Sequence, residues 1–293
     1  MIQSNEIYNA YINECGIKKI KLKKLTAAQL IRKAYYEEDN ELYMDKIREL
    51  QARGNREIFN LAKALVYSKD AIYREIAGTL LSQFAFKTKS FKGERIYLLS
   101  RLLDDKNEDV ISSAIYGFGH RKATLYGDKL ASFATSKSLD IKRALAFALG
   151  GYESKKAIEA LILLMNDNDF DTRNWATFSL AQICELDTSA IRNALYKNLN
   201  DIESEVRGEA LEGLASRKDI RVINAIIEDL QRDFYGSWIF SAIVEMPDRR
   251  YLQYFDKYVD SLHEEDKKAF ARDIEKALQA LLLYRGRKEF KKR

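Results

Sequence analysis

The 293-residue chain is 46% hydrophobic and 32% charged, which is enough apolar material for one large domain or two ordinary ones. Its only proline is Pro247, so almost nothing interrupts long runs of helix. The 13 glycines are few for a β-sandwich with its many tight turns. The formal net charge of +5, from 49 basic and 44 acidic residues, is a mild excess that concentrates at the two ends. This composition favours helix almost throughout.

The chain lacks the sequence features of secreted and membrane proteins. Cys15 and Cys184 are too few and too far apart for a disulfide framework or a paired-cysteine metal site. The N-terminal segment has no basic stretch followed by an apolar run, as a signal peptide would. No stretch of about 18 apolar residues occurs that could span a bilayer. We therefore expect a soluble, cytoplasmic protein that does not enter a membrane.

Residues 1–70 form the first predicted segment. Their apolar periodicity predicts three helices, at Thr26–Glu38, Asn40–Ala52 and Asn55–Tyr67. We expect these divergent N-terminal helices to stack on the array that follows.

A short motif then recurs through the centre of the chain. Its clearest copy is Asp140–Gly150, which reads DIKRALAFALG. Successive copies begin about 31 to 34 residues apart, a period typical of helical repeats. Weaker copies begin at Ala71 and Asp233. The clearer copies cover residues 109–119, 140–150, 171–181 and 205–215.

Each part of the motif has a physical role in a helix. The acidic residue is expected to cap the start of the helix and to favour the positive end of its dipole. The apolar residue next to it begins a stripe on one helical face. Small residues let a neighbouring helix approach closely. The basic residue two places after the acid, which is Lys142, Arg173 or Arg207, is expected to reach an acidic group in an adjacent repeat.

A second amphipathic segment follows each clear motif and completes a helix pair. These segments are Lys155–Asn166, Ser189–Asn200 and Ile220–Gln231. A single pair cannot bury its own apolar face, so stacked neighbours must bury it. The predicted repeats span residues 71–262. Residues 263–284 are predicted to form a C-terminal capping helix, and residues 285–293 a basic tail.

The motif resembles the short HEAT-like repeats of phycocyanobilin lyase subunits, with their core D-[VI]-[RK]-x-x-A-x-x-x-L-G. This resemblance implies an all-α fold, a right-handed α-solenoid (superhelix) of stacked helix pairs. It specifies the architecture more than the function, because scaffolds, lyases and DNA-repair proteins share such repeats. In the related alkylpurine DNA glycosylases, tryptophans and an aspartate hold damaged DNA. No such motif can be matched here, so Trp175 and Trp238 are interpreted as core residues.

The sequence supplies no candidate catalytic residue, metal site or cofactor site. The two histidines, His120 and His263, have no second histidine or cysteine at ligand spacing. The acidic run Asn166–Asp171 alternates like a calcium loop but lacks the central glycine and the distal glutamate. We interpret it as an acidic helix cap. No tetrapyrrole-handling feature or glycosylase motif accompanies the repeats.

The favoured hypothesis is a non-enzymatic protein-binding scaffold or adaptor, a class that includes inhibitors and immunity-type proteins. Stacked repeats present a long curved surface, usually concave, and we expect the second helices to line it. Tyrosine and arginine among mixed charges are typical of protein interfaces. The candidate contact residues are Arg192, Asn193, Tyr196, Lys197, Arg221, Asn224 and Glu228.

The alternative hypothesis is a nucleic-acid-binding HEAT-like protein related to the alkylpurine DNA glycosylases. The basic residues of segment 18–24 and of the tail 285–293 could contact phosphates. Glu203, Glu205, Glu209 and Glu212 interrupt any continuous basic stripe between those ends. The sequence therefore favours a protein partner over nucleic acid.

Overall fold

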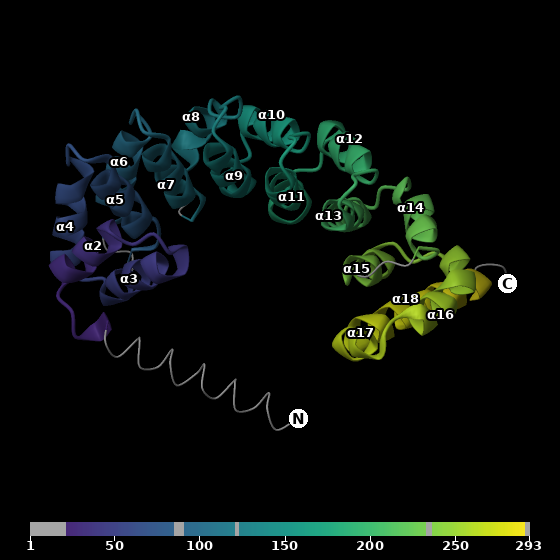
Figure 1. The fold of residues 1–293 in the computed structure, drawn as a ribbon. Coiled ribbons are helices and arrows are strands. Elements are labelled where there is room, and N and C mark those ends of the chain that lie inside the picture. The colour runs from purple at the N-terminus through teal and green to yellow at the C-terminus, as the bar shows by residue number, and fades with distance from the viewer. Residues whose placement is uncertain (1–21, 85–90, 121–122, 233–235, 291–293) are drawn as a thin grey trace, which may run out of the picture. The chain divides into compact units, whose positions relative to one another are not determined.

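The computed structural model describes residues 22–84, 91–120, 123–232 and 236–290, with side chains described as far as Tyr284. About 75% of the chain is helical, and no strand occurs among the described residues (Figure 1). This confirms the predicted all-α solenoid. The chain divides into two compact units, residues 1–123 and residues 124–293. Within the described ranges, no helix is both long enough and apolar enough to cross a membrane.

In the first unit, the described chain folds into successive antiparallel helices. The three N-terminal helices predicted from periodicity are confirmed, with ends that differ by a few residues. Leu30, Ile47 and Ile58 are buried, one on each of these helices. The helices are α2 (Ala27–Tyr35), α3 (Asn40–Arg53), α4 (Arg56–Val66), α5 (Ala71–Gln83), α6 (Lys92–Leu102) and α7 (Glu108–Gly119).

The second unit continues the same pattern. The three predicted second helices are present, and each ends two residues earlier than its sequence segment. The elements are η1 (Thr124–Tyr126), α8 (Gly127–Ala131), α9 (Leu139–Ala148), η2 (Leu149–Gly151), α10 (Lys155–Leu164), α11 (Phe170–Phe178), the π-helical turn η3 (Ser179–Ile183), α12 (Ser189–Asn198), α13 (Ser204–Ser216), α14 (Val222–Asp229), α15 (Trp238–Glu245), η4 (Arg249–Tyr251), α16 (Leu252–Ser261), α17 (Glu264–Ala269) and α18 (Ala271–Phe290).

The helices of the second unit form two rows (Figure 1). The first helices of the repeats, α9, α11, α13 and α15, follow one another along the inner side of the unit's curve. The second helices, α8, α10, α12 and α14, follow its outer side. Ala148, at the end of α9, and Leu149, at the start of η2, are both buried.

Small residues set how closely the first helices approach one another. A Cβ atom on Gly213 would lie 2.6 Å from the Cβ and 2.9 Å from the Cα of Ala181. At Gly150, a Cβ would lie 2.7 Å from the hydroxyl of Ser179. The small motif residues are therefore needed for helix contact.

The helix caps differ in one respect from the prediction. The acidic residue of the motif lies in the first turn of α7, α9, α11 and α13, and does not occupy the cap position. The residue two places earlier takes the cap, as Asp169 does in accepting from the backbone N–H of Thr172. The motif acid keeps only its favourable position at the positive end of the helix dipole. Side chains that cap in this way are Thr26, Asp39, Asn55, Asp70, Asn107, Ser154, Asp169 and Thr188.

Arginine–aspartate bridges connect successive repeats. The Arg173 guanidinium donates to both carboxylate oxygens of Asp201, at 2.8 and 3.0 Å. The same guanidinium donates at 3.1 Å to the carbonyl oxygens of Asp167 and Asn168, in the loop before its own helix. In the first unit, Arg74 likewise joins Asp105 to the loop before α5.

The inter-repeat contacts predicted for Lys142 and Arg173 are confirmed. Lys142 donates to Asp167 at 2.6 Å. Arg207 departs from the pattern, because it donates to the carbonyl oxygens of Asp201 and Ile202 and forms no ion pair within the described structure. Among the described residues, Arg207 therefore makes no bridge to the next repeat.

The C-terminal segment is divided differently from the prediction. The single helix predicted for residues 263–284 is two helices, α17 and α18, and α18 continues to Phe290 into the predicted tail. Lys18, Lys19, Lys21 and Cys15 lie outside the described residues, as do the side chains from Arg285 onward. Lys23 and Lys24 are described and exposed.

A glycine substitution tests the close approach of α11 and α13. We expect Gly213→Ala to lower the free energy of unfolding by about 1–3 kcal/mol, because the new methyl group meets backbone of the neighbouring repeat. Gly93→Ala is the matched control: no atom lies within 4 Å of its added Cβ. The control should stabilise by about 0.5–1 kcal/mol through helix propensity. Urea unfolding followed by circular dichroism measures both, and equal effects would contradict this packing.

Candidate partner-binding surface

The predicted contact residues lie on the second helices of two consecutive repeats. Arg192, Asn193, Tyr196 and Lys197 lie on α12. Arg221 directly precedes α14, which carries the other two residues. The two arginines are half-buried and the rest of the set is exposed.

Asp219 is the centre of the contacts within this surface. Its buried carboxylate accepts from Arg221 through the backbone N–H at 3.1 Å, Nε at 2.9 Å and Nη2 at 2.7 Å. Arg192 Nη1 lies 3.5 Å from the same carboxylate. Hydrogen bonds from Arg221 lower the pKa of Asp219 to about 2. One buried anion therefore fixes two arginines from adjacent repeats.

Arg221 brings the predicted residues of α12 and α14 together. Its Nη1 donates to the side-chain oxygen of Asn193 at 2.8 Å. Its guanidinium lies 4.7 Å from the ring centroid of Tyr196, at cation–π distance. The Tyr196 side chain is thus held in place while the residue remains 43% exposed. We call Asn193, Tyr196 and Arg221 the tyrosine cluster.

Arg192 has a structural role that the sequence did not indicate. It donates at 2.6 Å to each carboxylate oxygen of Asp187, and at 2.5 Å to the carbonyl oxygen of Arg217. Arg217 in turn donates to the carbonyl oxygens of Leu180, Ala181 and Cys184, at the end of α11. The sequence analysis missed Arg217. Its only signal there is a basic residue just after a helix, where basic residues often cap carbonyl groups.

The remaining predicted residues lie outside the tyrosine cluster. Lys197 Nζ donates to the side-chain oxygen of Asn166, after α10. Glu228 Oε2 lies 3.8 Å from Arg232 Nη2. Asn224 is exposed, and its side chain makes no hydrogen bond in the described structure. These residues are accessible, but nothing orders them as Arg221 orders Tyr196.

An open groove lies on the same row of helices, between α8 and α10. Its volume is about 450 Å³. Ala131, Ala160 and half-exposed Leu163 give it an apolar floor, and Lys156 and Asp128 form an ion pair of 3.1 Å at its rim. The second-helix row therefore offers apolar area as well as the tyrosine cluster.

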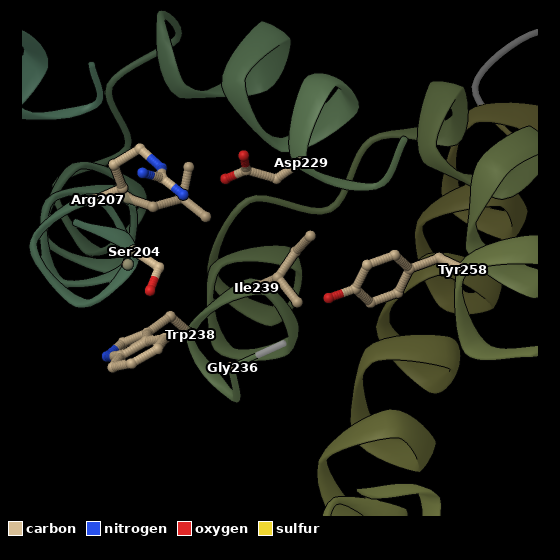
Figure 2. A pocket seen from close by; sticks show the side chains of 9 residues that line it. Ser204, Arg207, Asp229, Gly236, Trp238, Ile239 and Tyr258 are labelled. Carbon is tan, nitrogen blue, oxygen red and sulfur yellow. The ribbon is translucent and has the colours of Figure 1, made fainter. Parts of the chain in front are cut away.

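A small pocket lies between α13, α14, α15 and α16 (Figure 2). Its volume is about 20 Å³, which is room for about one water molecule. Arg207 and Asp229 lie at one end, and the Tyr258 ring points in from α16. Burial raises the pKa of the Asp229 carboxyl. The pocket is too small for a substrate.

Two expectations about the surface are wrong. The second helices lie on the outer row of the second unit and do not line its inner side (Figure 1). Trp175 is not a core residue, because it is 41% exposed on the first-helix row. Trp238 is half-buried, and its indole N–H donates to Glu209 at 3.1 Å. The apolar pattern on one helix does not show whether that helix lies on the inner or the outer row.

Comparison with known proteins defines the family. The family model of HEAT repeats matches residues 97–181 and 127–215. Protein YibA of Escherichia coli K12 is 31% identical over 261 residues, which cover 87% of this chain and 89% of YibA. The chain is a HEAT-repeat protein of the YibA family.

Solved structures agree with this assignment. The X-ray structure of Escherichia coli YibA is 29% identical and has a TM-score of 0.70, covering 92% of this chain and 96% of that one. Yeast importin-beta is 13% identical, with a TM-score of 0.57 over 91% of this chain and 43% of its own. At that identity, importin-beta shows the shared fold alone.

The role of Asp219 can be tested through the pH dependence of stability. We expect Asp219→Asn to lower the free energy of unfolding at pH 7 by about 1–3 kcal/mol, because two arginines lose their shared anion. The folded pKa, about 2, lies below the ordinary 3.8. The contribution is therefore complete above pH 3.8 and is lost as the pH falls through the folded value. The deficit of the variant should shrink between about pH 4 and pH 2.

Urea unfolding of both proteins across that pH range is the measurement. Asp187→Asn is the matched control, since its side chain is 43% exposed and also pairs with Arg192. An exposed pair of this kind contributes at most about 1 kcal/mol. A deficit for Asp219→Asn that is no larger than the control's, or that persists at pH 2, would contradict the central position of Asp219.

Proposed function

We propose that this chain is a non-enzymatic protein-binding scaffold or adaptor whose second-helix row contacts a protein partner. The observation that carries the proposal is Tyr196, which is 43% exposed yet held by Arg221 at 4.7 Å. Tyrosine and arginine are enriched among the side chains that contribute most to protein interfaces. A side chain that is already ordered loses little entropy when it is buried by a partner.

The surroundings of Tyr196 support a protein partner. The tyrosine cluster combines an aromatic ring, an amide and a cation that Asp219 already neutralises. Lys197, Asn224 and Glu228 add exposed polar groups of both signs at the rim. The apolar groove between α8 and α10 lies on the same row. An inhibitor or an immunity-type protein is one form of this function, in which the partner is an enzyme or a toxin.

The side chain to change first is Tyr196. Arg192 is unsuitable, because reversing its charge would place a third carboxylate beside Asp187 and Asp219. Tyr196→Ala leaves the bonds from Arg221 to Asp219 and Asn193 in place. We therefore expect a folded protein of nearly parental stability that binds its partner at least about tenfold more weakly.

The test uses the tagged full chain to recover partners from its source organism. The partner is then purified and its affinity is measured for the parent, for Tyr196→Ala and for Tyr36→Ala. Tyr36 is 71% exposed and lies after α2, so it is the matched control. Equal loss in both variants, or no loss in Tyr196→Ala, would contradict the proposed contact.

Nucleic-acid binding is the alternative outcome. It would give tight binding to duplex or single-stranded nucleic acid that falls steeply as salt rises. Such binding, unchanged by Tyr196→Ala and with no protein recovered, would overturn the scaffold proposal.

A further inference from the structure

The first-helix row of the second unit exposes an aromatic group. Trp175 on α11 is 41% exposed. Its ring meets Phe147 of α9 edge-on at a centroid distance of 5.4 Å, and Phe178 of its own helix at 5.7 Å. Both contacts are nearly perpendicular, with interplanar angles of 89° and 87°. The indole is therefore fixed by its neighbours while much of its surface stays open.

Two carboxylates occupy the matching positions of the next repeat. Counting from the motif acids Asp171 and Glu205, Trp175 corresponds to Glu209 and Phe178 to Glu212. Equivalent positions of stacked repeats lie side by side, and α11 packs directly against α13. The row thus passes from an aromatic surface to an acidic one within a single repeat.

Hydrogen bonds hold Glu209 in place. It accepts from the indole N–H of Trp238 at 3.1 Å and from the Gln182 amide at 3.2 Å. Gln182 lies in the π-helical turn that ends α11, where the Cys184 N–H donates to the Ser179 carbonyl oxygen at 2.9 Å. The turn therefore connects the aromatic helix directly to the carboxylate of the next one.

No cation balances these two carboxylates within the described part of the chain. Burial raises the pKa of both, and the negative charges of Glu209 and Glu245 raise the pKa of Glu212 further. Neither glutamate forms an ion pair with a described lysine or arginine, whereas Glu245 pairs with Lys218 at 2.5 Å. Asp167, Asp169 and Asp201 are all paired with basic residues.

We propose that the first-helix row over α11 and α13 is a docking surface for an arginine- or lysine-bearing segment of a protein partner. The cationic side chain lies against Trp175, and its charge is received by Glu209 and Glu212. Charge complementarity selects this occupant, because the surface combines an open indole with two carboxylates that lack a counterion. Phosphate groups would be repelled here.

This surface is distinct from the tyrosine cluster on the second-helix row. The inference rests on the proposed function only in that the ligand is a protein. Tyr196→Ala tests binding to the second-helix row, and the variants of Trp175, Glu209 and Glu212 test binding to the first-helix row. Together they show whether a partner uses one row or both.

A cationic peptide tests the proposal on the full chain. The probe is an acetylated hexa-arginine peptide, with hexa-glutamate as the negative control, titrated by calorimetry at low and physiological salt. We expect the parent to bind hexa-arginine and not hexa-glutamate. Glu209→Gln combined with Glu212→Gln, and separately Trp175→Ala, should each weaken binding at least about tenfold.

Matched variants distinguish this site from a general effect of charge. Glu159→Gln with Glu264→Gln removes the same charge from exposed positions on α10 and α17 and should leave the affinity unchanged. Tyr36→Ala, outside both surfaces, should also leave the affinity unchanged. The Glu209→Gln and Glu212→Gln variant should melt at the parental temperature or higher, because it removes two half-buried charges.

The proposal is overturned if hexa-arginine does not bind the parent. It is also overturned if the Glu159 and Glu264 control weakens binding as much as the Glu209 and Glu212 variant. Because the hexa-arginine probe needs no natural partner, its failure to bind would not contradict the proposed contact at Tyr196. If only Tyr196→Ala weakens binding of the natural partner, the natural partner uses the second-helix row, and the hexa-arginine result is unaffected.

Discussion

Arg173 is held between two loops that belong to successive repeats. Its guanidinium donates to the carbonyl oxygens of Asp167 and Asn168 on one side and to the Asp201 carboxylate on the other. Arg74 and Asp105 repeat this arrangement in the first unit. Since the arginine and its aspartate are largely buried, the bridge fixes the spacing of neighbouring repeats. The surfaces on both rows depend on that spacing.

The spacing of the repeats brings residues of different repeats into contact. Tyr196 is ordered by Arg221 of the following repeat, and Glu209 accepts from Gln182 of the preceding one. Neither contact would survive a shift of one helix along the other. The two rows differ in chemistry. The second-helix row is mixed in charge, and Asp219 balances its two arginines. The first-helix row carries an exposed indole and two glutamates that pair with no lysine or arginine in the described part of the chain. A solenoid with two such rows is suited to holding a partner by extended contact.

The architecture was predictable from the sequence because each repeat shows its apolar stripe and small packing residues locally, as in Asp140–Gly150. The inter-repeat contacts of Lys142 and Arg173 could be inferred from the repeat period. Other features depend on tertiary structure and could not be foreseen. The exposure of Trp175 depends on which row curves inward. The fixing of Arg192 depends on Asp187 and on the Arg217 carbonyl oxygen of the next repeat, and the turn that positions Gln182 is a local π-helix.

The most direct test of the account is a double-mutant cycle on Arg173 and Asp201, with Arg173→Ala, Asp201→Ala and the double variant compared in urea unfolding. The two side chains are only 12% and 9% exposed, so the account predicts a coupling free energy of about 1–3 kcal/mol. The exposed pair Lys63 and Glu94, at 51% and 54%, is the comparison and should give at most about 0.5 kcal/mol. Equal coupling in the two pairs would contradict the claim that buried inter-repeat bridges fix the spacing of the repeats.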